Sequence, residues 1–311
     1  MDERQTSLTI AEALLAAMTG LRKAGLPEPR REANSLLMHA TGRDHAFLIT
    51  HADDELTAEQ LSIFRDSLRR RAAGEPFQYI AGRQEFYGLE FEVTPDVLIP
   101  RPETELLVEA ALELLKGAPA PHVCDVGTGS GCVAVTLLHE RRDARGLALD
   151  ISPAALAVAA RNAARHGVGG RLRFLVSDCF DALGGGAHEG ARGGEGEGAR
   201  GGGDGATRFD LVASNPPYIA EDELAGLQKE VRDHEPRVAL TPGGDGLGVV
   251  RRLVREAPAF LKPGGHLLVE IGFGQDERVR ALVDPAVWTL LDIRRDLQGI
   301  PRTVVLRLRA G

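Results

Sequence analysis

From His122 to the C-terminus, short apolar segments of strand character alternate with segments of helical periodicity. This order is typical of a parallel sheet with helices on both faces. We expect the last two strands to pair in an antiparallel manner, because only a turn at Gly299 separates them. The seven predicted strands are 122–126, 146–150, 171–176, 209–214, 265–271, 287–293 and 303–308. The sequence therefore predicts an α/β domain with a Rossmann-like, seven-stranded sheet.

The first part of the chain shows a different pattern. Residues 5–73 have helical periodicity only, with capping boxes at Thr9 and Thr57 and a helix that ends at Gly42. The stretch 82–93 then alternates apolar and polar residues around Gly88, which predicts a short hairpin. We therefore expect a helical domain at 1–82, a hairpin linker at 83–96 and the α/β domain at 97–311.

Charge and cysteine content narrow the functional classes. The chain carries a net charge of −8, and residues 1–82 hold ten Lys and Arg against twelve Asp and Glu. An electrostatic clamp for nucleic acid needs a basic surface, so a protein partner is the better expectation for the helical domain. The start of the chain lacks a signal-peptide pattern and no apolar run approaches 18 residues, so we expect a cytosolic protein that does not enter a membrane. The three cysteines have neither disulfide nor zinc spacing, and no metal is expected.

A glycine-rich turn follows the first predicted strand of the α/β domain. It reads Asp125-Val126-Gly127-Thr128-Gly129-Ser130-Gly131, and a helix begins at Cys132. Glycines let the backbone turn tightly and lie against a nucleotide-bearing ligand, although a simple tight connection between strand and helix is the alternative. The next strand ends at Asp150, where a carboxylate can accept hydrogen bonds from both ribose hydroxyls. Together these features indicate a cofactor that contains adenosine.

The chemistry of the turn favours one cofactor. A dinucleotide site expects the spacing G-x-G-x-x-G and a pyrophosphate, whereas this turn has G-x-G-x-G with Asp125 before it, and a carboxylate repels a pyrophosphate. A cationic sulfonium with an α-amino group suits nearby acids and carbonyls, which points to S-adenosylmethionine. The third strand closes at Asp178 and Cys179, where we expect the adenine. Asp178 is a candidate acceptor for the adenine amino group, and a helix-capping role for Asp178 is the alternative.

A low-complexity segment interrupts the α/β domain. Residues 184–205 contain 12 glycines in 22 positions, mixed with Glu, Arg and Ala. Such a composition cannot bury enough apolar surface to offset the entropy of ordering, so we expect a disordered loop.

The loop Asn215-Pro216-Pro217-Tyr218 follows the fourth predicted strand of the domain. Proline has no amide hydrogen and a fixed φ, so the loop is stiff and its carbonyls are not used by a local hydrogen-bond ladder. The Asn215 carboxamide oxygen and the Pro216 carbonyl can each accept one hydrogen of an –NH2 group, and the Tyr218 ring can cover its flat face. An ordinary turn is the alternative. The motif indicates a site for an amide or an exocyclic amine.

Two further sets of charged residues are open to either a functional or a structural interpretation. Arg101 and Glu103 flank Pro102 at the predicted start of a helix, and they are either substrate contacts or solvated side chains. His234 is a candidate general base, but a single histidine without a placed partner is weak evidence, so no proton-transfer role is assigned to it.

Taken together, these motifs resemble those of the release-factor glutamine methyltransferases, the HemK/PrmC family, and the likeness extends over nearly the whole chain. The motifs that carry it occur in family order: Ile99 to Glu105, Asp125 to Gly131, Asp150, Ser177-Asp178, Asn215 to Tyr218, His234 to Arg237 and Gly243 to Gly246. Cys179 departs from the pattern, because members often carry a bulky aromatic residue there. The glycine-rich insert is a second departure.

The resemblance implies transfer of a methyl group from S-adenosylmethionine to the N5 atom of the glutamine in a Gly-Gly-Gln motif of class I peptide chain release factors. It also implies that the turn at 127–131, Asp150, the position of Cys179 and Asn215 contact the cofactor, and that 215–218 hold the substrate glutamine. We expect a monomer. Methylation of a base amino group in DNA or RNA and a non-catalytic nucleotide-binding module remain as alternatives.

Overall fold

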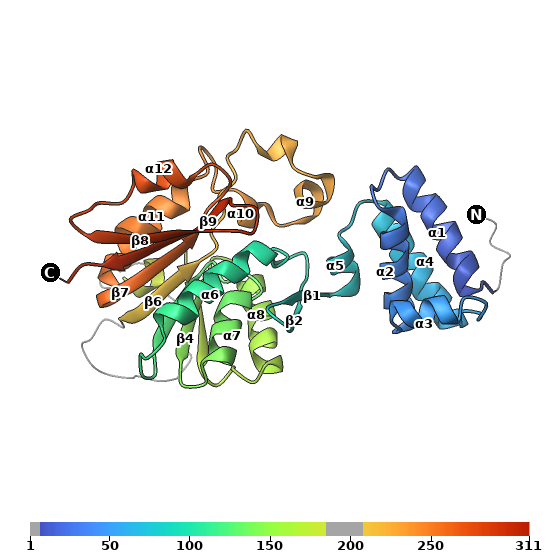
Figure 1. The fold of residues 1–311 in the computed structure, drawn as a ribbon, viewed down its shortest axis with the longest axis horizontal. Coiled ribbons are helices and arrows are strands. Elements are labelled where there is room, and N and C mark those ends of the chain that lie inside the picture. The colour runs from blue at the N-terminus through green and yellow to red at the C-terminus, as the bar shows by residue number, and fades with distance from the viewer. Residues whose placement is uncertain (1–6, 185–207, 311) are drawn as a thin grey trace, which may run out of the picture. The chain divides into compact units, whose positions relative to one another are not determined.

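The computed structural model describes residues 7–184 and 208–310 (Figure 1). The chain divides into two compact units, of which the first combines Met1–Arg83 with Leu227–His234. The second combines Gln84–Gly226 with Glu235–Gly311. The glycine-rich segment expected at 184–205 lies outside the described residues except for Gly184.

The first unit is helical, as its periodicity predicts. Both expected capping boxes form, at Thr9 and at Thr57, and Gly42 ends the second helix in the left-handed conformation with φ 65°. The helices enclose a core in which Leu21, Leu36 and other apolar side chains are fully buried. Their bounds are α1 Ile10–Lys23, α2 Pro29–Thr41, α3 His45–Thr50, α4 Ala58–Ala72, α5 Phe77–Ala81 and α9 Lys229–His234.

A buried arginine connects the distant segment 227–234 to the rest of this unit. Arg71 of α4 forms an ion pair with Glu32 of α2 at 2.7 Å and another with Glu230 of α9 at 2.9 Å. Its guanidinium also donates to the backbone carbonyl of Glu75 at 3.0 Å. Because only 7% of the Arg71 side chain is exposed, both carboxylates compensate a charge that water barely reaches.

The expected hairpin consists of β1 (Arg83–Phe86) and β2 (Leu89–Glu92). Phe86 and Phe91 are buried in a core of the second unit. The amide of Glu92 donates to Oδ1 of Asn162 at 2.8 Å, and the Asn162 amide group donates back to the Glu92 carbonyl. The hairpin is therefore packed against the α/β domain along most of its length.

The second unit contains the predicted seven-stranded sheet, with strand order β5-β4-β3-β6-β7-β9-β8. The strands up to β7 are parallel, and β9 pairs antiparallel with both β7 and β8. This confirms the predicted sheet and the antiparallel pairing of the last two strands. The bounds are β3 His122–Val126, β4 Arg145–Asp150, β5 Leu172–Val176, β6 Phe209–Ser214, β7 Leu261–Glu270, β8 Trp288–Arg295 and β9 Pro301–Leu308.

The largest error in the predicted strands is the start of β7. The sequence predicts 265, but the strand begins at Leu261 and includes Pro263 and Gly264. The register with β6 shifts between Phe209 and Leu211, so an irregular step absorbs the Pro-Gly pair without ending the strand. Pro263 and Gly264 therefore resemble a strand boundary in the sequence, although both lie within β7.

Helices cover both faces of the sheet (Figure 1). One apolar core lies under α6 (Glu105–Leu114), α7 (Cys132–Glu140) and α8 (Pro153–Arg165). The other core lies under α11 (Gly248–Glu256) and α12 (Asp276–Arg280). The predicted helix start at Pro102 is a 3-10 turn, η1 (Pro102–Thr104), which leads into α6. The remaining short elements are α10 Arg237–Leu240, η2 Asp181–Leu183, η3 Leu224–Gly226 and η4 Ala257–Ala259.

None of the helices within 7–184 and 208–310 combines the length and the apolar character that a bilayer span requires.

Candidate active site

The glycine-rich turn after β3 is fixed by backbone hydrogen bonds and by Asp125. The amides of Gly127 and Thr128 donate to the carbonyl of Leu149 in β4, at 2.8 and 3.0 Å. Asp125 Oδ2 accepts from Thr128 Oγ1 at 2.7 Å and from the amide of Ala134 in α7 at 3.2 Å. Burial raises the pKa of the Asp125 carboxyl to about 6, against the effect of these two hydrogen bonds. Asp125 therefore joins the strand, the turn and the first turn of the helix.

Asp150 ends β4 beside this turn. Its Oδ2 accepts from the amide of Gly129 and its Oδ1 accepts from the amide of Ser152, each at 2.9 Å. Burial raises the pKa of the Asp150 carboxyl, and the backbone donors oppose that effect. Each carboxylate oxygen has two lone pairs, so both oxygens can accept one further hydrogen bond. The side chain is held in place and remains able to bind a ligand with two hydroxyl groups.

A cavity of about 550 Å³ lies at the carboxyl ends of the central strands. Ligands of doubly wound sheets bind at this edge, and the volume is within the range of small-molecule sites. The cavity is lined by eleven of the residues that the sequence predicts for the site: Asp125, Gly127, Thr128, Gly129, Ser130, Asp150, Asp178, Cys179, Asn215, Pro216 and Pro217. The topology thus brings four separate segments of the chain to one concave surface.

Four predicted site residues do not line the cavity. Gly131 precedes α7 with φ 82°, and a Cβ atom there would lie 3.1 Å from Cβ of Ala159, so this glycine allows α7 and α8 to approach closely. Arg101 forms an ion pair with the buried Glu235 at 2.5 Å. Tyr218 and Glu103 lie near Glu270.

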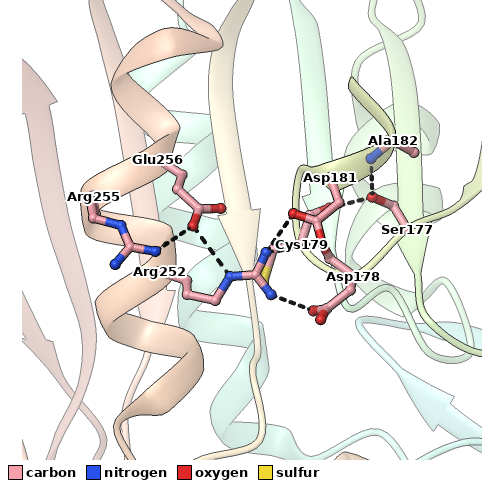
Figure 2. A network of polar contacts seen from close by, with 8 residues as sticks. All are labelled: Ser177, Asp178, Cys179, Asp181, Ala182, Arg252, Arg255 and Glu256. Atoms are coloured by element: carbon pink, nitrogen blue, oxygen red, sulfur yellow. Dashed lines mark hydrogen bonds and ion pairs between the residues drawn. The ribbon is translucent and has the colours of Figure 1, made fainter. Parts of the chain in front are cut away.

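Asp178 and Cys179 belong to a loop that is held by Arg252 of α11 (Figure 2). The Arg252 guanidinium contacts Asp178 at 2.8 Å, Asp181 at 2.7 Å and Glu256 at 3.3 Å. Ser177 Oγ accepts from the amide of Ala182 at 3.1 Å, whereas the N-cap position of η2 is Phe180, which has no side-chain capping hydrogen bond. The Asp178 side chain therefore does not cap η2, and it pairs with Arg252 instead.

Cys179 adopts the left-handed backbone conformation, with φ 48°. Non-glycine residues rarely adopt it, and its energetic cost requires support from the surrounding structure. The Ser177 hydroxyl supplies such support by donating to the Cys179 carbonyl at 2.9 Å. Burial raises the pKa of the Cys179 thiol to about 12, so the side chain is a neutral, apolar part of the cavity wall.

The Asn-Pro-Pro-Tyr loop is anchored at both ends. Ser214 Oγ donates to the Val126 carbonyl at 2.7 Å, and Gln275 Nε2 donates to the Tyr218 carbonyl at 2.8 Å. The Asn215 carboxamide donates through Nδ2 to Thr104 Oγ1 at 3.0 Å. From the described residues, neither Asn215 Oδ1 nor the Pro216 carbonyl accepts a hydrogen bond. Two acceptors beside the cavity are therefore free to hold a ligand.

Two residues not assigned to the site from the sequence contact this loop: Thr104, which also lines the cavity, and Glu270. Thr104 Oγ1 donates to Glu270 Oε2 at 2.7 Å, and Tyr218 Oη makes a longer contact with Glu270 Oε1 at 3.4 Å. Burial raises the pKa of the Glu270 carboxyl to about 7, and the negative charge of Glu103 adds to that effect. The signal in the sequence is a glutamate that ends an otherwise apolar strand segment, Leu267 to Val269, next to the strand that carries Asn215.

Within the described ranges, no group of three or more His, Cys, Asp and Glu side chains is arranged to hold a metal ion.

Both parts of the chain match known protein families. Residues 12–82 match the family model described as the PrmC N-terminal domain, and residues 119–273 match a methyltransferase domain. A release factor glutamine methyltransferase of Cereibacter sphaeroides is 47% identical over 301 residues, which are 97% of this chain and 99% of the relative. Proteins of the same name from Koribacter versatilis and Nitratidesulfovibrio vulgaris are 41% and 42% identical. The first covers 96% of this chain and 99% of the relative, and the second covers 99% and 98%.

These matches confirm the resemblance inferred from the motifs, and they extend through both units of the structure. The chain belongs to the release factor glutamine methyltransferase family.

Proposed function

We propose that this protein transfers a methyl group from S-adenosylmethionine to the side-chain amide nitrogen, N5, of the glutamine in the Gly-Gly-Gln motif of class I peptide chain release factors. The relatives that match nearly the full chain carry the name of this activity. The structural observation that carries the proposal is the pair of free acceptors, Asn215 Oδ1 and the Pro216 carbonyl, beside a cavity of about 550 Å³. Two acceptors match the two hydrogens of a primary amide.

The residues around the cavity fit the cofactor. Asp150 offers two carboxylate oxygens for the ribose hydroxyls, and Gly127 and Gly129 leave the turn without side chains on the ligand side. Cys179 adds an apolar wall for the adenine, and Asp178 lies at the same edge. When bound, S-adenosylmethionine supplies an electrophilic methyl group on a positively charged sulfur. The nearby Asp125 and Asp150 carboxylates favour a cation in this cavity.

The Asn-Pro-Pro-Tyr loop must compensate for the weak nucleophilicity of an amide nitrogen, whose lone pair is delocalised into the carbonyl. In our proposal Asn215 Oδ1 and the Pro216 carbonyl each accept one amide hydrogen and so fix the nitrogen toward the cavity. The same two oxygens stabilise the positive charge that develops on the nitrogen. Tyr218 covers the flat face of the amide, and Arg101 and Glu103 contact the substrate outside the cavity, which neither of them lines. The extra proton can leave to water, so His234 is given no proton-transfer role.

The remaining parts of the proposal concern partners and location. The acidic balance of residues 1–82 favours a protein over a nucleic acid as the partner of the helical domain. We propose that the enzyme acts as a cytoplasmic monomer, with 1–82 in substrate recognition, and that it reads no nucleic-acid sequence itself.

The acceptor can be identified with methyl-labelled S-adenosylmethionine. The purified protein is incubated with a release factor, with the same factor whose Gly-Gly-Gln glutamine is replaced by alanine, and with RNA and DNA. We expect label in the first sample only. Label in the alanine-substituted factor, or in RNA or DNA in preference to the release factor, would contradict the proposed substrate.

The role of the loop is tested by Asn215→Ala, which removes one of the two acceptors. Loss of a preorganised polar contact in a transition state typically lowers kcat by about 10²-fold or more, so we expect a fall of that order with the fold retained. Asn215→Asp keeps the shape but adds a charge, and we expect lower turnover with little change in S-adenosylmethionine affinity. Full activity of Asn215→Ala would refute the mechanism.

A further inference from the structure

Three polar side chains from distant parts of the chain form a hydrogen-bonded relay that begins at the cavity wall, where Asn215 and Thr104 lie, and ends at the buried Glu270. Asn215 Nδ2 donates to Thr104 Oγ1 at 3.0 Å, and Thr104 Oγ1 donates to Glu270 Oε2 at 2.7 Å. Asn215 follows β6, Thr104 ends η1 and Glu270 ends β7. Thr104 and Glu270 are each only 1% exposed. Water therefore has little access to Thr104 and Glu270, whereas Asn215 is half-buried and lines the cavity.

The two ends of an asparagine carboxamide have nearly the same shape and opposite hydrogen-bonding character. Oδ1 accepts hydrogen bonds, whereas Nδ2 donates them. If the amide of a glutamine substrate is to be held by its hydrogens, Asn215 must present Oδ1 to the cavity. A carboxamide turned by 180° would present hydrogens to hydrogens and would repel the same substrate.

We propose that Glu270 and Thr104 are positioning residues that determine which end of the Asn215 carboxamide faces the glutamine amide of the substrate. This inference rests on the proposed function. An ionised carboxylate only accepts hydrogen bonds, so the single hydrogen of the Thr104 hydroxyl is directed to Glu270. The Thr104 oxygen then has only lone pairs to offer to Asn215, and these pair with Nδ2. Oδ1 thereby keeps no partner among the described residues and can accept a hydrogen bond from a ligand in the cavity that Asn215 lines.

Two neighbours support the polarity of the relay. The Tyr218 hydroxyl points its hydrogen at the second carboxylate oxygen of Glu270, at 3.4 Å, and the positive charge of Arg302 also favours the ionised carboxyl. Burial acts in the opposite direction and raises the pKa of Glu270 to about 7, so measurements at pH 8.5 keep the carboxyl ionised. Tyr218 is thus connected to Asn215 through Glu270 and Thr104.

The structure offers a matched control for a test at Thr104. Thr303 in β9 lies opposite Glu270 in the strand register and is fully buried. Its hydroxyl has no hydrogen-bond partner among the described residues. Thr104→Val and Thr303→Val are therefore the same nearly isosteric change, made at a threonine inside the relay and at a threonine beside it. Thr104→Ser restores the hydroxyl in the first position.

The first experiment measures single-turnover methyl transfer to a release factor at pH 8.5, together with S-adenosylmethionine affinity by calorimetry. For Thr104→Val we expect a rate lowered by about 10- to 100-fold, as for loss of a buried hydrogen bond, and a cofactor Kd within about twofold of wild type. Thr104→Ser should recover most of that rate, and Thr303→Val should match wild type. Equal rates for the two valine variants would overturn the inference. So would a Thr104→Val variant that loses rate, cofactor affinity and melting temperature together without rescue by serine.

A second measurement is made on the enzyme alone and needs no methyl-acceptor substrate. With 15N-labelled asparagine, the Asn215 side-chain amide should show slowed hydrogen exchange in wild type and in Thr303→Val, and fast exchange in Thr104→Val. Fast exchange in wild type would overturn the relay even if the enzyme is active. An inactive wild type with a protected Asn215 amide would instead contradict the proposed function and leave the orientation of Asn215 established.

Discussion

Gly129 and Gly131 lie in the same turn and both adopt left-handed backbone conformations, with φ 54° and 82°. Alanine at either position must enter a region that costs L-residues about 1 to 2 kcal/mol. Their surroundings differ, because a Cβ at 129 would meet no atom within 4 Å. At 131 it would lie 3.1 Å from Cβ and 3.3 Å from Cα of Ala159 in α8, and overpacking typically adds about 1 to 3 kcal/mol.

We therefore expect Gly131→Ala to lower the free energy of unfolding by about 2 to 5 kcal/mol and Gly129→Ala by about 1 to 2 kcal/mol. Urea unfolding followed by tryptophan fluorescence reports on the second unit, which contains both the glycine turn and Trp288. Trp288 in β8 is the only tryptophan of the sequence and is buried. Its indole nitrogen donates to the Val254 carbonyl at 3.0 Å, so its environment changes when the sheet separates from α11.

A double-mutant cycle isolates the steric contribution. Combining Gly131→Ala with Ala159→Gly removes the atom that the new methyl group would meet, so the pair should couple favourably by about 1 kcal/mol or more. Equal destabilisation by alanine at 129 and 131, or an absence of coupling with Ala159→Gly, would refute the steric argument.

Three further predictions concern charged groups of the cavity. Asp150→Ala should weaken S-adenosylmethionine binding by about 1.5 to 3 kcal/mol, measured by calorimetry, and unchanged affinity would remove Asp150 from the site. The pKa of Asp125 is about 6 in the folded protein against 3.8 for a free side chain, so the folded protein holds this proton more tightly and the contribution of Asp125 to stability falls as pH rises from about 4 to 6. Asp125→Asn cannot titrate and should gain up to about 3 kcal/mol relative to wild type over that window in urea titrations, and a constant difference would contradict this pKa. Arg252→Met frees the loop of Asp178 and should weaken cofactor binding about tenfold by the loss of about one charged hydrogen bond. Arg255→Met should not, because Arg255 pairs with Glu256 and not with that loop in the part of the chain that the structure describes.

Much of the cavity could be predicted because each of its segments follows a strand in the sequence. Asp125, Asp150, Asp178 and Asn215 come at or just after strand ends, and parallel strands bring those ends to one edge of the sheet. The short apolar runs made these ends visible without any knowledge of the fold. The bounds of β3 and β6 agree with prediction because polar or turn residues flank both strands.

The relay behind Asn215 could not be predicted in the same way. Thr104 and Glu270 are 166 residues apart, and their contact depends on the placement of η1 beside the end of β7. A glutamate at the end of an apolar strand segment marks Glu270 as unusual, but nothing local indicates which residue it contacts. The ion pair between Arg71 and Glu230 could not be predicted for the same reason. Glu230 lies in a polar stretch that forms only a short helix, and Arg71 is more than 150 residues away in the sequence.

The inclusion of Leu227–His234 in the helical unit has a consequence for the order in which the protein can fold during synthesis. The ribosome makes residues 1–83 first, but Arg71 lacks its Glu230 partner until most of the α/β domain has been translated. The helical unit therefore reaches its final set of contacts only after the first four strands of the large sheet, through Ser214, have been made. The two units are interleaved in the chain, so a fragment that ends near residue 83 lacks a helix of its own unit, and a fragment that begins at 84 carries a helix that belongs to the other.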